Sequence, residues 1–278
     1  MVKYEKEVGQ LRTVTKVERQ KKKKNRLNIY LDGEYAFSIS DDIYVKFHVH
    51  KGKQLSEEAI ATIIHEDHLH RAYVAAIQYL RYRMRTEAEI RRHLRKKEMK
   101  EAVIDRIVSR LYEEKLLDDL EFAESFVRDR MNRSTKGPLL IEKELKEKGV
   151  SESDIKTALE QFTHEKQVEQ AKKWLEKEMK KKLNTSYKRK KEQLSAKLLQ
   201  RGFSKEAAKE ALNAVPFEKD ESEEFLLLKN HADKLYTKYK NKYDGFELEM
   251  KLKERLYMRG FEFDQIESYV RKLLEEEL

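Results

Sequence analysis

The sequence predicts a mainly α fold: tandem three-helix repeats in an elongated curved array, preceded by a small N-terminal β-meander. Three observations support this class. The 278 residues include only 8 Gly and 2 Pro, so residues that interrupt helices are scarce. Apolar residues recur with helical spacing from about His70 to the end of the chain. The first 55 residues instead contain runs in which apolar and polar side chains alternate.

The N-terminal segment predicts three antiparallel strands. Residues 13–17 and 27–31 alternate apolar and polar side chains, as half-buried strands do, and Lys21–Lys24 form a four-lysine tip between them. The pair Asp32-Gly33 then separates the second run from residues 34–39. An Asp-Gly pair between alternating runs is a hairpin signal, because glycine tolerates the positive φ of a type I′ turn.

The rest of the chain repeats a pattern of apolar residues around four anchor positions. Gly149, Gly202 and Gly260 anchor three copies, and Glu98 occupies the same position in an earlier copy. Apolar residues lie eight and four positions before each anchor, and one, six and ten positions after it. A left-handed C-cap at the anchor ends one helix, and the next apolar stripe predicts a second. An amphipathic helix upstream makes three per copy, which excludes a tetratricopeptide array with its two helices and shorter period.

These patterns give the expected domain boundaries. The helix that follows the meander should begin at Ser56 and end near His65, because Ser56 is a capping residue followed by two acids. We therefore expect a β-meander over residues 1–55, a connecting helix over 56–69, and four repeats over 70–117, 118–163, 164–217 and 218–278.

The composition argues against several classes of protein. The chain has no Cys, which removes disulfides and cysteine–zinc sites, and no apolar run approaches the ~18 residues of a membrane span. All eight Gly are separated by at least eleven residues, so no phosphate-binding or dinucleotide-binding loop is expected. His65 and His68 share one helix face, but no third ligand has a fixed spacing from them. We expect a cytoplasmic, non-enzymatic monomer that uses no cofactor and no metal.

The charge favours an anionic partner, with nucleic acid ahead of a membrane surface. The formal net charge is +9; residues 81–100 hold nine Lys or Arg against three Glu, and residues 172–191 hold ten against two. Such clusters bind phosphates with release of counterions, and the alternative is a solvated helix face. Tyr30, Tyr35 and Phe37 are either a base-stacking surface or the apolar face of the meander. The candidate contacts are Arg81, Arg83, Arg85, Arg91, Arg92 and Lys96 in the first repeat, and Arg130, Arg133 and Lys136 in the second.

Three short motifs resemble those of a known protein family. Residues 79–90 (YLRYRMRTEAEI), in which Thr86-x-x-Glu89 is a capping box, are similar to the helix end, Arg-rich turn and capped second helix of the RecX family of RecA regulators. Residues 117–123 (LDDLEFA) resemble its acidic start before a Phe-Ala pair. Residues 136–138 (KGP), which lead to the turn at Gly149, resemble its other hallmark.

The resemblance is close over about residues 70–162 and periodic to the C-terminus, and the N-terminal strands are similar to those of longer Firmicute-type members. It implies a curved rod of repeats that binds the RecA filament on single-stranded DNA, touches the DNA weakly, and inhibits or remodels the filament in recombination and repair. Two departures are Met84, where the family often has Pro, and Glu98-Met99 in place of a Gly-centred turn. The alternative is an autonomous DNA-binding protein with helix-turn-helix-like repeats, whose binding needs no filament.

Overall fold

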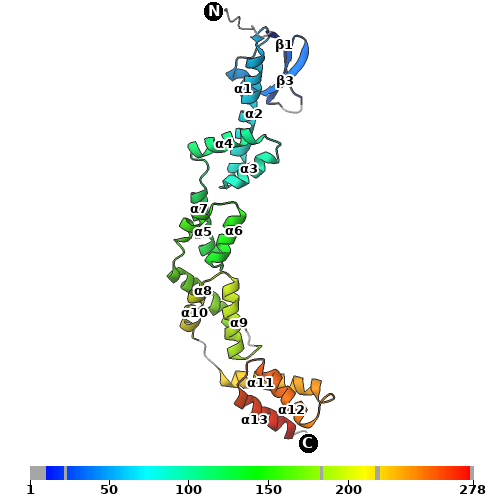
Figure 1. Ribbon diagram of the computed structural model, residues 1–278, viewed down its shortest axis with the longest axis vertical. Coiled ribbons are helices and arrows are strands. Elements are labelled where there is room, and N and C mark those ends of the chain that lie inside the picture. Colours follow the sequence, from blue (N-terminus) through cyan, green and yellow to red (C-terminus); the bar gives the residue numbers. More distant parts are fainter. Residues whose placement is uncertain (1–10, 22–23, 182–183, 217–219, 276–278) are drawn as a thin grey trace, which may run out of the picture. The chain divides into compact units, whose positions relative to one another are not determined.

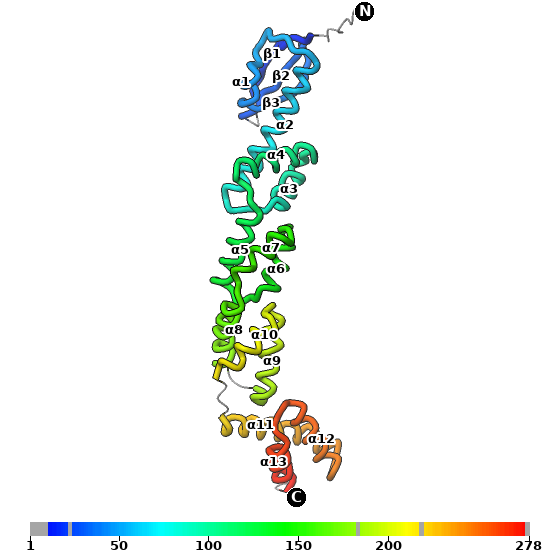
Figure 2. Tube along the Cα trace, turned by 60° about the vertical axis from the view of Figure 1, so that its left-hand side comes forward, coloured from blue at the N-terminus to red at the C-terminus, as the bar shows by residue number. Residues whose placement is uncertain are grey.

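The computed structural model of the chain describes residues 11–21, 24–181, 184–216 and 220–275 (Figures 1 and 2). Residue contacts divide the chain into two units: Met1–Phe122 with Lys148–Ser151, and Ala123–Glu147 with Glu152–Leu278. The centre of the predicted lysine tip, Lys22 and Lys23, lies outside the described residues.

The N-terminal strands form a four-stranded antiparallel sheet in the order β3-β2-β1-β4. The predicted three-stranded meander is confirmed as β1 (Arg12–Arg19), β2 (Arg26–Leu31) and β3 (Glu34–Ser40). The sequence did not indicate β4 (Gln54–Leu55), because a strand of two residues is too short to show alternation.

The turn between β2 and β3 has the backbone that the Asp-Gly pair predicts. Asp32 has φ 52° and Gly33 has φ 96°, and two positive φ values in succession are characteristic of a type I′ turn. The Asp32 carboxylate also accepts hydrogen bonds from the Thr13 amide and the Arg12 guanidinium, both at 2.9 Å. These bonds tie the turn to the neighbouring strand.

A single long helix, α2 (Glu57–Leu80), connects the sheet to the first repeat. Its N-cap is Ser56, as predicted, and the Ser56 side chain accepts from the amide of Ala59. The prediction that this helix ends near His65 was wrong: the connecting helix and the first helix of the repeat are continuous. No Gly or Pro lies between residues 56 and 80, so nothing local ends the helix.

A buried ion pair joins the sheet to α2. The Arg26 guanidinium lies 3.1 Å from the Asp67 carboxylate, whose side chain is only 2% exposed. Asp67 also accepts a 2.7 Å hydrogen bond from the amide of Ser40, which precedes the short helix α1 (Asp41–Lys46). Because an unpaired buried carboxylate is costly, these two contacts fix the sheet against the helix.

In the described residues, the second half of α2 and the helices that follow it form four successive groups of three, which confirms the predicted repeat (Figure 1). The first group is the second half of α2 with α3 (Glu87–Arg95) and α4 (Glu101–Glu113). The second is α5 (Asp119–Arg133), α6 (Pro138–Glu147) and α7 (Glu152–Leu159). The third and fourth are α8 (His164–Met179), α9 (Tyr187–Gln200) and α10 (Lys205–Ala214), then α11 (Glu221–Tyr239), α12 (Gly245–Tyr257) and α13 (Phe263–Glu275).

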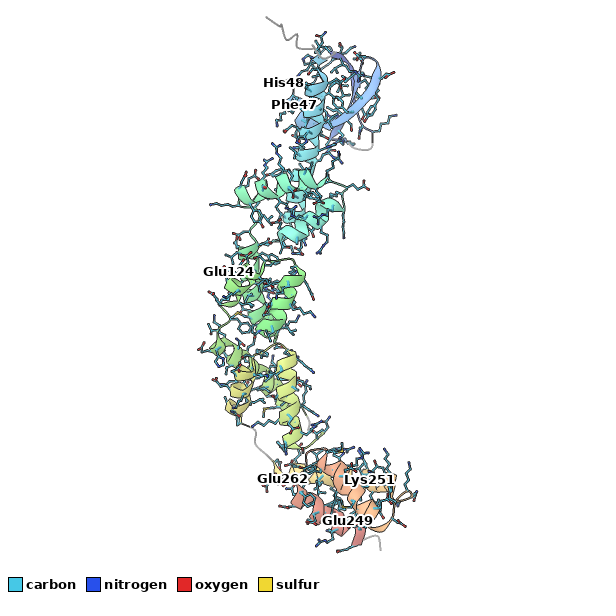
Figure 3. The ribbon with its side chains drawn as sticks, in the orientation of Figure 1. Phe47, His48, Glu124, Glu249, Lys251 and Glu262 are labelled. Atoms are coloured by element: carbon cyan, nitrogen blue, oxygen red, sulfur yellow. The ribbon has the colours of Figure 1, made fainter. Side chains whose placement is uncertain are left out.

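The three anchor glycines adopt the left-handed conformation that was predicted for them, and Glu98 adopts it as well. The φ values are 80° at Gly149, 86° at Gly202, 83° at Gly260 and 60° at Glu98. The turn at Glu98 therefore has the same backbone as the glycine turns, although a side chain makes this conformation less favourable. Side chains fill the space between the helices of each group (Figure 3). Apolar residues four and eight positions before the anchors are buried, among them Ile90, Leu94, Ile141, Leu145, Leu194, Leu198, Leu252 and Leu256.

None of the helices in the described part of the chain is long and apolar enough to span a bilayer.

Candidate nucleic-acid interface

The Arg-rich turn of the first repeat is held by a capping box. Arg81 caps the C-terminus of α2, and Thr86 caps the N-terminus of α3. The Thr86 hydroxyl accepts from the Glu89 amide at 3.2 Å, and the Glu89 carboxylate accepts from the Thr86 amide at 3.4 Å. Two reciprocal hydrogen bonds therefore fix the turn that carries the predicted arginines at the end where α3 begins.

Arg83 already has an anionic partner within the chain. Its guanidinium makes two hydrogen bonds to the Glu89 carboxylate, at 2.9 and 3.0 Å, and a third to the Met84 carbonyl at 2.8 Å. The Glu89 side chain is 11% exposed, and Lys148 lies 3.8 Å from it. Burial alone would raise the pKa of Glu89, but Arg83 and Lys148 hold that pKa below its ordinary value. Arg83 therefore neutralises a half-buried carboxylate of its own repeat.

Arg85 belongs to a layered stack of planar groups. Its guanidinium lies 3.9 Å from the centre of the Tyr79 ring, and Tyr79 stacks on His93 with a centroid distance of 4.1 Å and an angle of 2°. Burial, with the nearby charges of Lys97, Arg85 and Lys96, lowers the pKa of His93. His93 is therefore neutral at pH 7, and a neutral ring is the better neighbour for a guanidinium.

Arg91, like Arg83, is paired with carboxylates of its own repeat. It contacts Glu87 at 2.7 Å, one helical turn earlier, and Asp105 on α4 at 2.6 Å. The side-chain hydrogen bonds that Arg91 donates to Glu87 and Asp105 raise the pKa of Arg91. These contacts link α3 to α4, so Arg91 is structural in this arrangement.

Three of the predicted cations of the first repeat have no such partners. Arg81, Arg92 and Lys96 are exposed, and none forms an ion pair with the described residues. Arg92 and Lys96 lie four residues apart at the end of α3, so they share one helix face. Two further cations, Lys97 and Lys100, follow α3 and are also exposed without an ion pair to the described residues. The four that lie within nine residues, at the end of α3 and in the turn after it, are the free-cation surface: Arg92, Lys96, Lys97 and Lys100.

The three candidates of the second repeat gather around two carboxylates. The Arg130 guanidinium lies 2.7 Å from Glu144, and Lys136 contacts the same carboxylate. Burial opposes ionisation of Glu144, but Lys136 and Arg130 hold its pKa below the ordinary value. Arg133 contacts Asp129 at 3.1 Å, yet its side chain is 82% exposed. Of the three, Arg133 is the most accessible to a ligand.

Sequence reasoning missed a basic cleft in the second unit. A cavity of about 660 Å³ lies between the end of α5 and α8. Gln170 of α8 donates to the carbonyls of Met131 and Ser134, at 2.6 and 2.9 Å, and so holds the two elements together. Five cations and one carboxylate, Glu169, line the cleft; the cations are Arg128, Arg133, Lys166, Lys173 and Lys177. Its residues come from two repeats, so no single run of sequence marks it.

The cluster of residues 172–191 contributes only in part to this cleft. Lys173 and Lys177 line it, whereas Lys181 contacts Glu178 at 2.5 Å and Arg189 contacts Glu192 at 3.2 Å. Lys182 lies outside the described residues. The cluster is therefore divided between the cleft and helix surfaces with local ion pairs.

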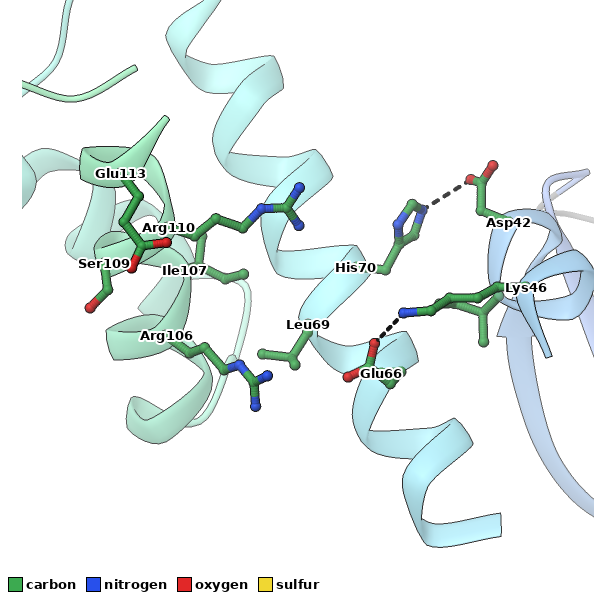
Figure 4. A pocket seen from close by; sticks show the side chains of 11 residues that line it. Asp42, Lys46, Glu66, Leu69, His70, Arg106, Ile107, Ser109, Arg110 and Glu113 are labelled. Atoms are coloured by element: carbon green, nitrogen blue, oxygen red, sulfur yellow. Dashed lines mark hydrogen bonds and ion pairs between the residues drawn. The ribbon is translucent and has the colours of Figure 1, made fainter. Parts of the chain in front are cut away.

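A second cleft, of about 510 Å³, lies between α1, α2 and α4 (Figure 4). Most of its charged groups are paired with each other. His70 lies 3.0 Å from Asp42, and Lys46 lies 2.7 Å from Glu66. Arg106 forms no ion pair with the described residues. With a single unpaired cation, this cleft is a weaker candidate for phosphate than the free-cation surface.

The histidines singled out in the sequence do not gather with other possible metal ligands. No group of three or more His, Asp or Glu side chains in the described ranges is arranged to hold a metal ion.

The aromatic side chains of the N-terminal sheet differ in burial. Phe37 is buried in the core of the sheet, whereas Tyr35 is exposed and meets Tyr30 edge to face with a ring-centroid distance of 5.9 Å. Phe37 therefore belongs to the apolar face of the meander, and the stacking interpretation applies to the two tyrosines alone.

Comparison with known proteins identifies the family. The model of the regulatory protein RecX N-terminal domain matches residues 12–56, and the models of the first, second and third RecX three-helix domains match residues 72–111, 118–159 and 222–270. The α8–α10 group lies between the second and third of these matches.

Full-length relatives and solved structures agree with these matches. The regulatory protein RecX of Halalkalibacterium halodurans is 39% identical over 92% of this chain and 98% of the relative. That of Oceanobacillus iheyensis is 38% identical over 96% and 100%. A crystal structure of regulatory protein RecX aligns with a TM-score of 0.61 at 37% identity, over 73% of this chain and 99% of that one. RecX from Lactobacillus salivarius aligns with a TM-score of 0.52 at 33% identity, over 53% and 96%. The chain belongs to the RecX family of regulatory proteins.

Proposed function

We propose that this protein is a non-enzymatic regulator that binds the RecA filament on single-stranded DNA and inhibits or remodels it, and thereby modulates recombination and DNA repair. Membership of a family of regulatory proteins supports the regulatory role. We choose RecA as the partner because the motifs at residues 79–90, 117–123 and 136–138 resemble those of the RecX family of RecA regulators. The structural observation that carries the proposal is the free-cation surface of the first repeat.

The free-cation surface suits phosphate because its charges are not neutralised by the chain. A cation that already contacts a carboxylate must break that pair before it binds phosphate, whereas Arg92 and Lys96 lose only water. The cluster is small, so direct affinity for bare single-stranded DNA is weak and depends strongly on salt. Several weak contacts along a filament that presents repeated subunits then add up to useful avidity.

The carboxylates near the candidate contacts support a binding role without catalysis. Glu89 and Glu144 are both paired with cations, and the pKa of each lies below its ordinary value. A carboxylate with a lowered pKa is a poor general base at neutral pH and is not protonated, so it is not a general acid either. These residues balance charge inside the repeats.

The DNA-dependent ATPase of RecA tests this function. Added in increasing amounts, the protein should lower the ATPase rate of RecA on single-stranded DNA while it hydrolyses no ATP itself. The alternative, an autonomous DNA-binding protein, predicts competition only through coverage of the DNA, so excess single-stranded DNA would relieve the inhibition. An ATPase rate that is unchanged at saturating protein would contradict the proposal.

A further inference from the structure

The repeats of this chain are joined by one recurring contact. The carbonyl of the residue before each anchor glycine accepts a hydrogen bond from the first residues of the middle helix of the preceding repeat. Three such bonds are present: Thr86 Oγ1 to the Lys148 carbonyl at 2.7 Å, the Gly137 amide to the Arg201 carbonyl at 2.7 Å, and Ser186 Oγ to the Arg259 carbonyl at 2.9 Å. The left-handed turn of one repeat therefore docks on the amino end of a helix in the repeat before it.

The docked turns leave no room for a side chain at the anchor. A Cβ atom on Gly149 would lie 2.3 Å from the Ala88 Cβ, well inside van der Waals contact. A Cβ on Gly202 would lie 2.6 Å from the Leu140 nitrogen. At Gly260 the nearest atom, the Ser186 Oγ, would be 2.6 Å away. Glycine is thus required at all three joints by the close approach as well as by its positive φ.

The middle helix of the fourth repeat, α12, makes no such contact with the described residues. In the first and third repeats the capping residues Thr86 and Ser186 are fully buried beneath the docked turn. At the start of α12, Asp244, Gly245 and Phe246 are exposed, and the Phe246 side chain is 75% exposed. The Asp244 carboxylate makes no capping hydrogen bond, and a Cβ on Gly245 would meet no atom within 4 Å.

The turn at Glu98 also differs from the other anchor turns, because it is exposed and its anchor residue carries a side chain. It has the left-handed backbone of the other anchors, and residues 95–98 are exposed. It carries a glutamate where the three joints have no space for a Cβ atom. The residue before it, Lys97, matches the basic residues that precede the anchor glycines, namely Lys148, Arg201 and Arg259.

We propose that the amino end of α12, comprising Asp244, Gly245, Phe246 and the neighbouring exposed Met250, is an open docking surface for the glycine-capped helix end of another protein. The occupant carries a basic residue followed by glycine at the end of a helix. Three joints inside the chain supply the precedent, and the exposed carboxylate of Asp244 complements the basic residue. Phe246 and Met250, one turn apart on α12, add apolar contact area.

Glu98 excludes a second copy of this chain from that surface. The glycine turns of the chain are already docked in its own joints, so the exposed Lys97-Glu98 turn is the one that another copy would offer from its described residues. Its Cβ atom would collide, and its carboxylate would face Asp244 with like charge. Without this block, each copy would carry both halves of a head-to-tail joint, which is the condition for open filaments. The inference does not rest on the proposed function.

Sedimentation velocity of the full-length protein tests the inference through Glu98→Gly, which supplies the missing glycine. The wild type and Glu98→Ala, which keeps a Cβ atom, should sediment as monomers at every concentration. Glu98→Gly should show a sedimentation coefficient that rises with concentration, and Phe246→Asp in the same chain should restore the monomer. Circular dichroism confirms that the variants are folded.

Each other result counts against the inference. If Glu98→Gly stays monomeric, the end of α12 is not a competent docking surface. If Glu98→Ala associates as strongly as Glu98→Gly, the Cβ atom is not the block. If association survives Phe246→Asp, the contact lies elsewhere.

Discussion

Arg83 and Glu89 form a two-point ion pair across the turn between α2 and α3, with N–O distances of 2.9 and 3.0 Å. The same glutamate closes the capping box of Thr86. An arginine that the sequence suggests as a nucleic-acid contact is thus paired with a carboxylate of its own repeat.

The first prediction concerns the stability of this turn. Arg83→Ala should lower the free energy of unfolding by about 1 kcal/mol, because it leaves the half-buried Glu89 without its main partner while Arg83 itself is partly exposed. Urea denaturation monitored by circular dichroism measures the change. Arg92→Ala, on the same repeat but unpaired, is the matched control and should change stability by less than ~0.5 kcal/mol. Equal losses in the two variants would refute the structural role of Arg83.

The second prediction concerns the free-cation surface. Arg92→Glu with Lys96→Glu should weaken binding to single-stranded DNA and to RecA filaments and leave the fold intact, since neither residue is paired or buried. Loss of a phosphate contact should also reduce the slope of log affinity against log salt by about 0.7 per contact. Fluorescence anisotropy from low to moderate salt measures both quantities. An unchanged affinity and slope would show that this face is merely solvated, and the assignment would move to the basic cleft of α5 and α8.

The third prediction concerns pH. The folded chain lowers the pKa of His93 below 6.5, so the unfolded chain binds the proton more readily. The stability that His93 contributes is therefore complete above about pH 6.5 and is lost as pH falls from there towards the folded pKa. Thermal melting between pH 7.5 and 5 should show a smaller decline for His93→Gln than for the wild type. His68 and His231 shift in the same direction, so the difference between the two proteins is the informative quantity. Parallel declines would contradict the account.

The fourth prediction separates close approach from backbone strain. Gly149→Ala should cost about 2–4 kcal/mol of stability, because the new Cβ would lie 2.3 Å from Ala88 at a φ of 80°. Gly52 has a similar φ of 90° but no atom near its Cβ position, so Gly52→Ala should cost only about 1 kcal/mol. Chemical denaturation of the two variants gives the comparison. Similar losses would mean that the joint at Gly149 adds nothing beyond backbone strain.

The sequence was most informative where structure follows from local pattern. The Asp32-Gly33 turn, the Thr86 capping box and the left-handed anchor glycines each depend on a few adjacent residues, and all were predicted. The continuous α2 was missed. Its first half packs against the sheet and its second half against α3 and α4, so its apolar residues follow two patterns that look like two separate helices.

The candidate site was harder to predict because its chemistry depends on distant neighbours. Arg91 and Arg92 are adjacent in the sequence, yet Arg91 meets Asp105 fourteen residues later and Arg92 meets no carboxylate of the described residues. The basic cleft likewise needs α5 and α8 from different repeats. Net charge in a window of sequence therefore located the clusters but did not separate paired from free cations.

The most direct measurement of the central claim compares binding to three targets: RecA filaments on labelled single-stranded DNA, the same DNA alone, and RecA alone. The account predicts binding to the filament that is at least tenfold tighter than to either component, because contacts to protein and phosphate add together. It also predicts that Arg92→Glu with Lys96→Glu reduces this advantage while Arg110→Glu, on α4 and paired with Glu114, reduces it less. Equal affinity for bare DNA and for the filament would contradict the account and support an autonomous DNA-binding protein.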